Sequence, residues 1–176
     1  MALNAQWKIF GPVDEKMSIP DNVDKTTYDA EVTLATSEHF EASWQDAKMV
    51  SGFLDLTHHY RHFLTSTKGT GFVAGNCKSK AVTYVYAPSA QKVEAVIGHD
   101  DRIQLSLNDE KWITVPEQAG FRPKRVALKL RRGWNKLSVL IHNRENITWR
   151  WEGISLALVG GHAKLRNIKF SVAPAG

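Results

Sequence analysis

The fold is decided by one alternating stretch, Arg102-Ile103-Gln104-Leu105-Ser106-Leu107-Asn108, in which polar and apolar residues take turns. Successive side chains of a β-strand point to opposite faces, so this pattern predicts a strand with one buried and one exposed face. Residues 92–98, 125–130 and 136–142 alternate in the same way. The second half of the chain therefore predicts a β-sheet protein.

Further strands are expected at residues 6–10, 28–35, 81–87, 147–154 and 167–172. Turn-forming residues separate the strands at 98–101, 108–111, 132–133 and 142–146. Short strands with turns every roughly 8 to 15 residues are typical of antiparallel sandwiches and jelly rolls. We expect an all-β antiparallel sandwich, a jelly roll with one short helix, that forms a single domain over residues 1–176.

The helix is expected at residues 51–63. Apolar side chains recur there at helical spacing, at Phe53, Leu56, Tyr60 and Phe63. Ser51 is in place to cap the first turn of this helix. His58 and His62 have the i, i+4 spacing of a metal-binding pair, but the glutamate of an H-E-x-x-H motif and a third ligand are missing. We interpret these histidines as residues of the helix surface.

The composition excludes several classes of protein. The chain has 176 residues, of which 43% are hydrophobic and 23% charged, which is typical of a globular domain and not of a disordered one. It has no apolar run of the roughly 20 residues that a membrane helix needs. The start, Met1-Ala2-Leu3-Asn4, lacks the pattern of a secretory signal. The single cysteine, Cys77, has no internal partner for a disulfide.

The charge is basic, with 23 Lys and Arg residues against 18 Asp and Glu residues. The basic residues are spread over the strands without an aromatic-basic motif, so we expect no nucleic-acid partner and no membrane partner. An acidic glycan is a better match for this charge, and we expect Arg102, Arg122, Lys124 and Arg125 to contribute. The chain has no G-x-S-x-G elbow and no phosphate-binding glycine loop, so we expect no catalytic residues.

Two consecutive carboxylates, Asp100 and Asp101, lie between expected strands. They could supply oxygen ligands for calcium, or they could be turn formers whose side chains bond the local backbone. The pattern leaves both interpretations open.

Six tryptophans are unusually many for a chain of this length. Trp149 and Trp151 share a strand face with Ile147, which favours a place in the core. Trp134, at the start of a strand, is expected to pack. Trp112 follows a turn, and Trp44 lies among polar residues and is expected to be half exposed, so these two are the candidates for stacking on a sugar.

The order of six motifs resembles that of a known family, the galactose-binding-like β-jelly-roll carbohydrate-binding modules appended to bacterial carbohydrate-active enzymes. The motifs are Trp7-Lys8-Ile9-Phe10-Gly11-Pro12, Gly52-Phe53-Leu54-Asp55-Leu56, the strand at 81–87, the stretch 98–108, Arg132-Gly133-Trp134-Asn135 after the strand at 126–130, and the closing stretch 149–158. The resemblance covers roughly residues 7–159. Asp109 departs from the pattern, because the family commonly has glycine after Asn108.

The resemblance implies a non-catalytic module that binds a poly- or oligosaccharide, often holds a structural calcium ion and is linked to a catalytic domain. Such a protein would act outside the cell or in the periplasm, as part of a larger protein. Together with the patterns above, this makes Trp112, Trp44, Asp100, Asp101, Arg102 and Arg122 the expected ligand-binding residues, with Asp100 and Asp101 as the metal ligands. The alternative is a structural accessory β-sandwich of a larger glycoside hydrolase or lyase, without a sugar site of its own.

Overall fold

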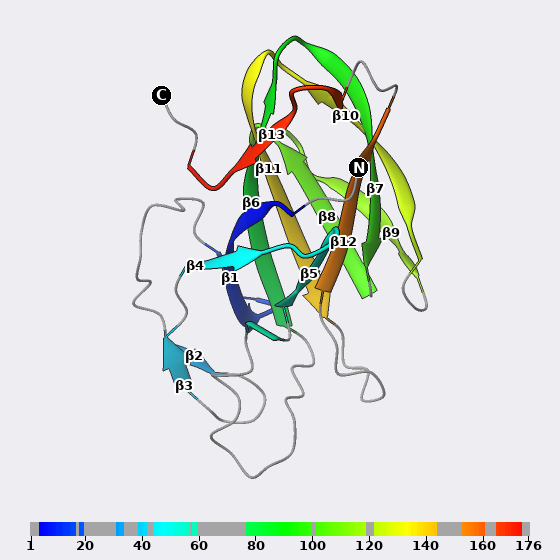
Figure 1. Cartoon of the computed structure of the whole chain (residues 1–176). Coiled ribbons are helices and arrows are strands. Elements are labelled where there is room, and N and C mark those ends of the chain that lie inside the picture. Colours follow the sequence, from blue (N-terminus) through cyan, green and yellow to red (C-terminus); the bar gives the residue numbers. More distant parts are fainter. Residues whose placement is uncertain are drawn as a thin grey trace.

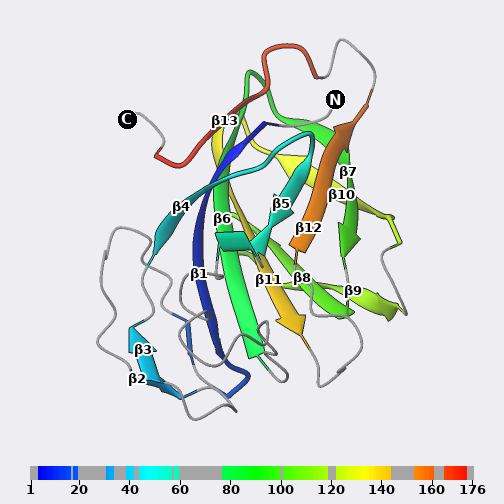
Figure 2. The ribbon, with the colours of Figure 1, turned by 60° about the horizontal axis from the view of Figure 1, so that its bottom comes forward.

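A computed structural model describes residues 4–16, 18–19, 31–33, 39–41, 44–56, 58–59, 77–99, 101–118, 122–143, 153–160 and 165–173. These residues form two main antiparallel sheets (Figures 1 and 2). The larger sheet has seven strands. Six of them follow the order β4 (Gln45–Lys48), β1 (Gln6–Asp14), β6 (Cys77–Ala87), β11 (Gly133–Asn143), β8 (Asp101–Leu107) and β9 (Ile113–Gln118). The seventh, β13 (Lys169–Ser171), pairs with β6.

The smaller sheet has four strands, in the order β10 (Lys124–Leu130), β7 (Gln91–His99), β12 (Gly153–Val159) and β5 (Phe53–Asp55). A separate ribbon joins β2 (Glu31–Thr33) to β3 (His39–Glu41) and lies below the two main sheets in Figure 1. Strands β9 and β10 are the terminal strands of their sheets. Each therefore has one side without a neighbouring strand of its own sheet.

The hydrophobic core lies between the two main sheets. The apolar residues of the alternating stretch around β8, Ile103, Leu105 and Leu107, belong to one buried cluster with Ile97 of β7 and Leu128 of β10. The predicted all-β antiparallel sandwich is confirmed, because the apolar half of each alternating stretch faces the other sheet. We call the opposite face of the seven-stranded sheet its outer face.

The expected turn at residues 98–101 is a corner between the two sheets. Strand β7 ends at His99 in the four-stranded sheet, and β8 begins at Asp101 in the seven-stranded sheet. The two strands therefore do not form a hairpin. Strand β8 instead pairs with β11 and β9, which places the β8–β9 hairpin at the edge of the larger sheet.

The helix expected over residues 51–63 is wrong in its first part. Residues 53–55 form strand β5, which pairs with β12, and helical backbone is found only from Leu56. Ser51 does not cap the helix, because it lies in the turn before β5 with a φ of 51°. The cap is Asp55, whose Oδ1 accepts a 2.9 Å hydrogen bond from the backbone N–H of His58. Residues 60–63 lie outside the described residues.

Other boundaries also differ from the sequence prediction. The strand expected at 28–35 is described only at Glu31–Thr33, and β12 begins at Gly153, inside the strand expected at 147–154. Trp149 and Trp151 lie outside the described residues. In the described part of the chain, no helix is long and apolar enough to cross a membrane.

Candidate functional site

The β8–β9 hairpin turns through Asn108 and Asp109. Both residues have positive φ, 54° and 58°, and the backbone N–H of Glu110 donates a 3.1 Å hydrogen bond to the carbonyl of Leu107. These values define a type I′ turn, whose twist matches that of the flanking strands. Asparagine tolerates the left-handed region, whereas aspartate is less suited to the second position than glycine. The turn directs the segment after it back along β8.

A buried asparagine holds this turn in place. The side chain of Asn135, fully buried at the start of β11, accepts a 3.0 Å hydrogen bond from Nδ2 of Asn108. Its Nδ2 group donates to the carbonyl oxygens of Arg131 and Gly133 at 2.8 and 3.0 Å. The same side chain therefore fixes the β8–β9 turn and the β10–β11 turn relative to each other.

Trp112 lies on the outer-face side of the hairpin. Gln104 pairs with Thr114 and Leu105 with Ile113, so Trp112 lies just before the paired segment, on the side of Ser106. Ser106 in turn pairs with Ser138 of β11. Because side chains alternate between faces, Trp112 shares the outer face with Ser106 and Thr114, while Ile113 faces the core side.

The indole of Trp112 leans over the sheet toward β6. The Nζ atom of Lys80, on β6, lies 5.8 Å from the centre of the ring. Strands β9 and β6 are three interstrand spacings apart, about 14 Å, so both side chains must extend over β8 and β11 to meet. Ser106 and Ser138, in the row of Trp112, are small and are only 3% and 2% exposed. Small side chains at these positions leave room for the ring, which is half-buried.

A polar network continues along the outer face beside Trp112. Gln104 donates from Nε2 to Oγ1 of Thr114 at 3.2 Å, and its Oε1 lies 3.1 Å from Nε2 of His142. The other ring nitrogen of His142 lies 2.7 Å from Oε1 of Glu15. Arg102, half-buried, pairs across the sheet with His142 and shares its face. We call Arg102, Gln104, Trp112 and Thr114 the hairpin platform.

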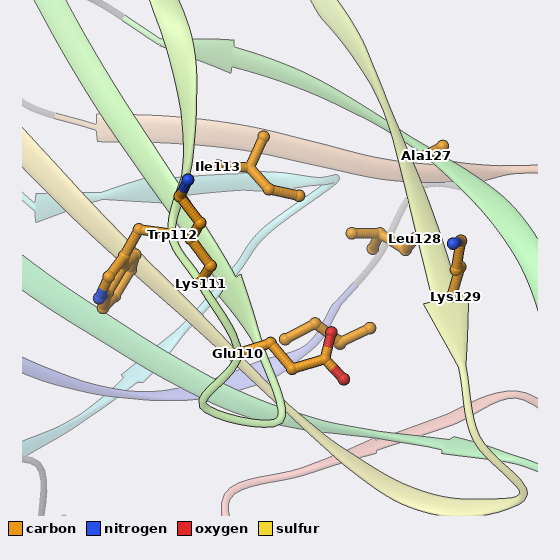
Figure 3. Close-up of a pocket in the computed structure, with 8 residues that line it drawn as sticks. Glu110, Lys111, Trp112, Ile113, Ala127, Leu128 and Lys129 are labelled. Atoms are coloured by element: carbon orange, nitrogen blue, oxygen red, sulfur yellow. The ribbon is translucent and has the colours of Figure 1, made fainter.

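The other side of the hairpin borders a cavity of about 460 Å³. We call it the edge groove. It lies between the hairpin and β10, the terminal strand of the other sheet (Figure 3). Its lining consists of Leu107, Glu110, Lys111, Trp112, Ile113, Ala127, Leu128 and Lys129. Figure 3 shows the indole of Trp112 directed away from β10, so the ring belongs to the platform even though the residue borders the groove.

The edge groove has an apolar floor and a basic rim. Leu107 and Leu128 are buried, and Ile113 is 45% exposed. Glu110 is bound to Arg131 by a 2.7 Å ion pair. Lys111 and Lys129 are exposed, and in the described part of the chain neither has a carboxylate partner.

The structure brings two of the expected site residues to one face and separates the others. Trp112 and Arg102 lie on the outer face, two side-chain rows apart, with Gln104 and Thr114 between them. Arg122 is exposed and lies just before β10, a strand of the four-stranded sheet. Asp100 lies outside the described residues. Asp101 opens β8, but its side chain also lies outside the described part, and no group of three metal-ligating side chains is found among the described residues.

The expectation that Trp44 is half exposed is wrong. Its side chain is only 7% exposed, and its ring lies 5.3 Å from that of Phe10 at an angle of 55°. A buried ring has no face for a ligand, so Trp44 is part of the packing. The expectation of packing for Trp134 agrees with the structure, where its ring makes an edge contact with Tyr86 at 5.4 Å.

Sequence reasoning missed Lys80 and the two groove lysines, Lys111 and Lys129. The parity of the alternating pattern places Lys80, Gln104 and Thr114 on one face once the register is known. That register comes from strand pairing, and the pattern of a single strand does not contain it. The edge groove had no signal in the sequence, since its walls come from two different sheets.

No protein-family model matches the chain, and no curated protein matches it. Several solved structures match parts of the chain. A family 35 carbohydrate-binding module from an environmental isolate matches 62% of this chain and 84% of its own, at 20% identity and a TM-score of 0.40. A family 35 carbohydrate-binding module from Clostridium thermocellum matches 47% of this chain and 71% of its own, at 18% identity and a TM-score of 0.32.

A β-glucosidase from Kluyveromyces marxianus, solved in complex with glucose, matches 92% of this chain at 15% identity and a TM-score of 0.48. The match spans only 18% of that enzyme. The β-sandwich that the sequence predicts is the architecture that the structure has.

Proposed function

We propose that the chain is a non-catalytic carbohydrate-binding module that binds a poly- or oligosaccharide on the hairpin platform. One observation carries the proposal: the half-buried indole of Trp112 is held over the outer face of a seven-stranded sheet, beside Gln104 and Thr114. An aromatic ring on a rigid element next to fixed hydrogen-bonding groups is the arrangement that a sugar-binding site needs.

Each part of the platform has a role in this proposal. The apolar face of a pyranose ring stacks on the Trp112 indole, and the hydroxyl groups bond to Gln104 and Thr114. Arg102, at the far end of the platform, meets an acidic substituent of the sugar. One stacked ring with a few hydrogen bonds gives modest affinity, with a Kd of about 1 μM to 1 mM.

We extend the proposal to the larger protein. A module of this kind holds a covalently linked catalytic domain close to its polysaccharide substrate, outside the cell or in the periplasm, which raises the effective concentration of the substrate. The basic balance of the chain supports an acidic polysaccharide.

Calcium is part of the proposal through Asp100 and Asp101. Consecutive carboxylates supply the oxygen atoms that calcium prefers, and Asp101 opens β8 where the chain enters the seven-stranded sheet, so an ion there would hold the start of that strand. Thermal unfolding with and without chelator tests this part: calcium should raise Tm, and the Asp101→Asn variant should abolish the rise. An equal Tm in both conditions contradicts it.

Isothermal titration against a panel of neutral and acidic oligosaccharides tests the main proposal. Trp112→Ala should weaken binding at least tenfold, and Trp112→Phe should keep part of it, because a smaller ring still stacks. Trp134→Ala is the matched control, since Trp134 is also a half-buried indole of the same sheet. A panel without any bound saccharide would falsify the proposal.

The alternative, an accessory sandwich that packs on a catalytic domain, has less support. Such a domain exposes a large apolar patch where its neighbour docks. Val50 and Ile113 are the exposed large hydrophobic side chains among the described residues, and Ile113 lines the edge groove.

A further inference from the structure

We propose that the edge groove is a second binding site, selective for an anionic saccharide whose carboxylate groups meet Lys111 and Lys129. The inference rests on the proposed function, in that the ligand is taken to be a saccharide. It differs from that function in place and in chemistry, because the groove lies on the other side of the hairpin from Trp112.

The shape of the groove suits a small extended ligand. Its volume of about 460 Å³ lies within the usual range of ligand-binding cavities, roughly 300 to 1,000 Å³. Leu107, Ile113 and Leu128 form an apolar floor between the terminal strands of the two sheets. The C–H groups of a sugar ring can cover this floor, while the charged substituents of the sugar reach the rim.

The charge of the rim selects an anion. The one carboxylate of the lining, Glu110, is neutralised by Arg131 at 2.7 Å. Lys129 lies directly opposite Lys92 in the β10–β7 register, and both side chains are exposed. Like charges directly opposite each other in a sheet destabilise it. A bound carboxylate near Lys129 would relieve this repulsion.

The lysines also have an ordinary interpretation as protection of an edge strand. Charged side chains on such strands discourage pairing with another chain. Strand β10 balances its charge elsewhere, however: Arg125 forms a 2.7 Å ion pair with Glu94 of β7. Lys124 and Lys129 of the same strand have no carboxylate partner among the described residues, and Lys129 lines the cavity. Edge protection alone does not explain the apolar floor beside Lys129.

The alternation along β9 separates the two sites. Trp112 directs its indole to the outer face, and Ile113, the next residue, directs its side chain to the groove (Figure 3). Substitutions at the rim of the groove should therefore leave the indole in place. The two sites can be tested independently in the same chain.

The test uses tetragalacturonate and its fully methyl-esterified form, which share one carbon skeleton and differ in charge. We expect the acid to bind more tightly than the ester, and the Lys111→Gln/Lys129→Gln variant to lose about tenfold or more in affinity for the acid only. Raising the salt from about 50 to 200 mM should weaken binding of the acid. Lys48→Gln is the matched control, because exposed Lys48 lies on β4, at the opposite edge of the seven-stranded sheet.

Each outcome decides one question. Equal binding of acid and ester, or full binding of the acid by the double lysine variant, overturns the anionic site while neutral saccharides still bind through Trp112. Loss of acid binding in Trp112→Ala but not in the lysine variant overturns it too, because a single site would then account for all binding. Tighter binding of a dT oligonucleotide than of tetragalacturonate contradicts a saccharide ligand. Absence of binding to every saccharide removes the proposed function together with this inference.

Discussion

Asn108 and Asn135 are joined by a 3.0 Å hydrogen bond between side chains that lie 27 residues apart in the sequence. Asn108 forms the first position of the β8–β9 turn, and Asn135 lies fully buried beside the β10–β11 turn. Oδ1 of Asn108 also accepts a 3.1 Å hydrogen bond from the backbone N–H of Lys136. The position of the hairpin that carries both candidate sites therefore depends on this pair.

Asn135→Ala should reduce the free energy of unfolding by about 3 kcal/mol, measured by urea denaturation. The substitution leaves the backbone N–H of Arg131 without its 2.8 Å acceptor, and it removes the donor to the carbonyls of Arg131 and Gly133. Asn4→Ala is the control, because Asn4 accepts one exposed hydrogen bond, from Ser51. Equal losses of unfolding free energy in the two variants would show that the buried hydrogen bonds of Asn135 contribute no more to stability than one exposed hydrogen bond.

Asp109→Gly should raise the free energy of unfolding by about 0.5 to 1 kcal/mol. Asp109 has a φ of 58°, which glycine adopts at no steric cost, and Asn-Gly is the preferred pair in a type I′ turn. The variant loses the 3.0 Å ion pair with Lys136, but Asp109 is largely exposed and the pair contributes little.

Asp109→Ala separates the two effects in the same denaturation experiment. Alanine loses the ion pair and keeps the backbone strain, so this variant should be less stable than the wild type. An alanine variant as stable as the glycine variant would contradict the argument from φ.

Trp44→Ala should reduce the free energy of unfolding by about 3 to 5 kcal/mol, as other large-to-small substitutions in cores do. Trp44→Phe should cost only about 1 kcal/mol. It keeps a ring next to Phe10, and it removes an indole N–H that is buried without an acceptor among the described atoms. Titration of the Phe variant with saccharide should give the wild-type Kd. Weaker binding would show that Trp44 contributes to the binding site.

Stability should fall as the pH is lowered through the titration range of His59. Burial, and then the neighbouring His58, lower the pKa of His59 below its usual 6.5, while Asp55 opposes the shift. The unfolded chain therefore binds more protons than the folded chain near this pH, so acid favours unfolding. The stabilising contribution is complete above the unfolded pKa and is lost as the pH falls through it toward the folded pKa.

Thermal unfolding at pH values from about 7.5 to 5.5 measures this effect. The wild type should lose more Tm over the range than His59→Gln does. His58→Gln should give an intermediate loss, because it removes only the second cause of the shift. An identical pH dependence in His59→Gln and the wild type would exclude His59 as the titrating group.

Strand periodicity predicted the larger part of the fold. The stretches around β7, β8, β10 and β11 alternate clearly, and each is a strand whose inward-facing apolar side chains are buried. The helix expected at residues 51–63 shows the limit of this reasoning. Phe53 and Leu56 have helical spacing, but residues 53–55 form a strand that pairs with β12. This pairing supplies backbone hydrogen bonds that local spacing does not reveal.

The candidate site was only partly predictable. Trp112 was singled out because it follows a turn, and it lies beside a polar network that supports that choice. Trp44 was wrongly chosen on its polar neighbours, since a strand buries one side chain while it exposes the next, whatever the local composition. Lys129 was overlooked, because its significance comes from a cavity between two sheets.

The alternation and turn residues of the chain are enough to establish that it is a sheet protein, which residues of its strands face inward, and where the β8–β9 hairpin turns. Those properties depend on the two-residue period of strands and on local turn chemistry, and both can be read from residues that follow one another in the sequence. Which strands are neighbours, and so which side chains meet, becomes known from the folded chain. Lys80 reaches Trp112, and Asn108 reaches Asn135, because strand pairing brings distant segments together in one register.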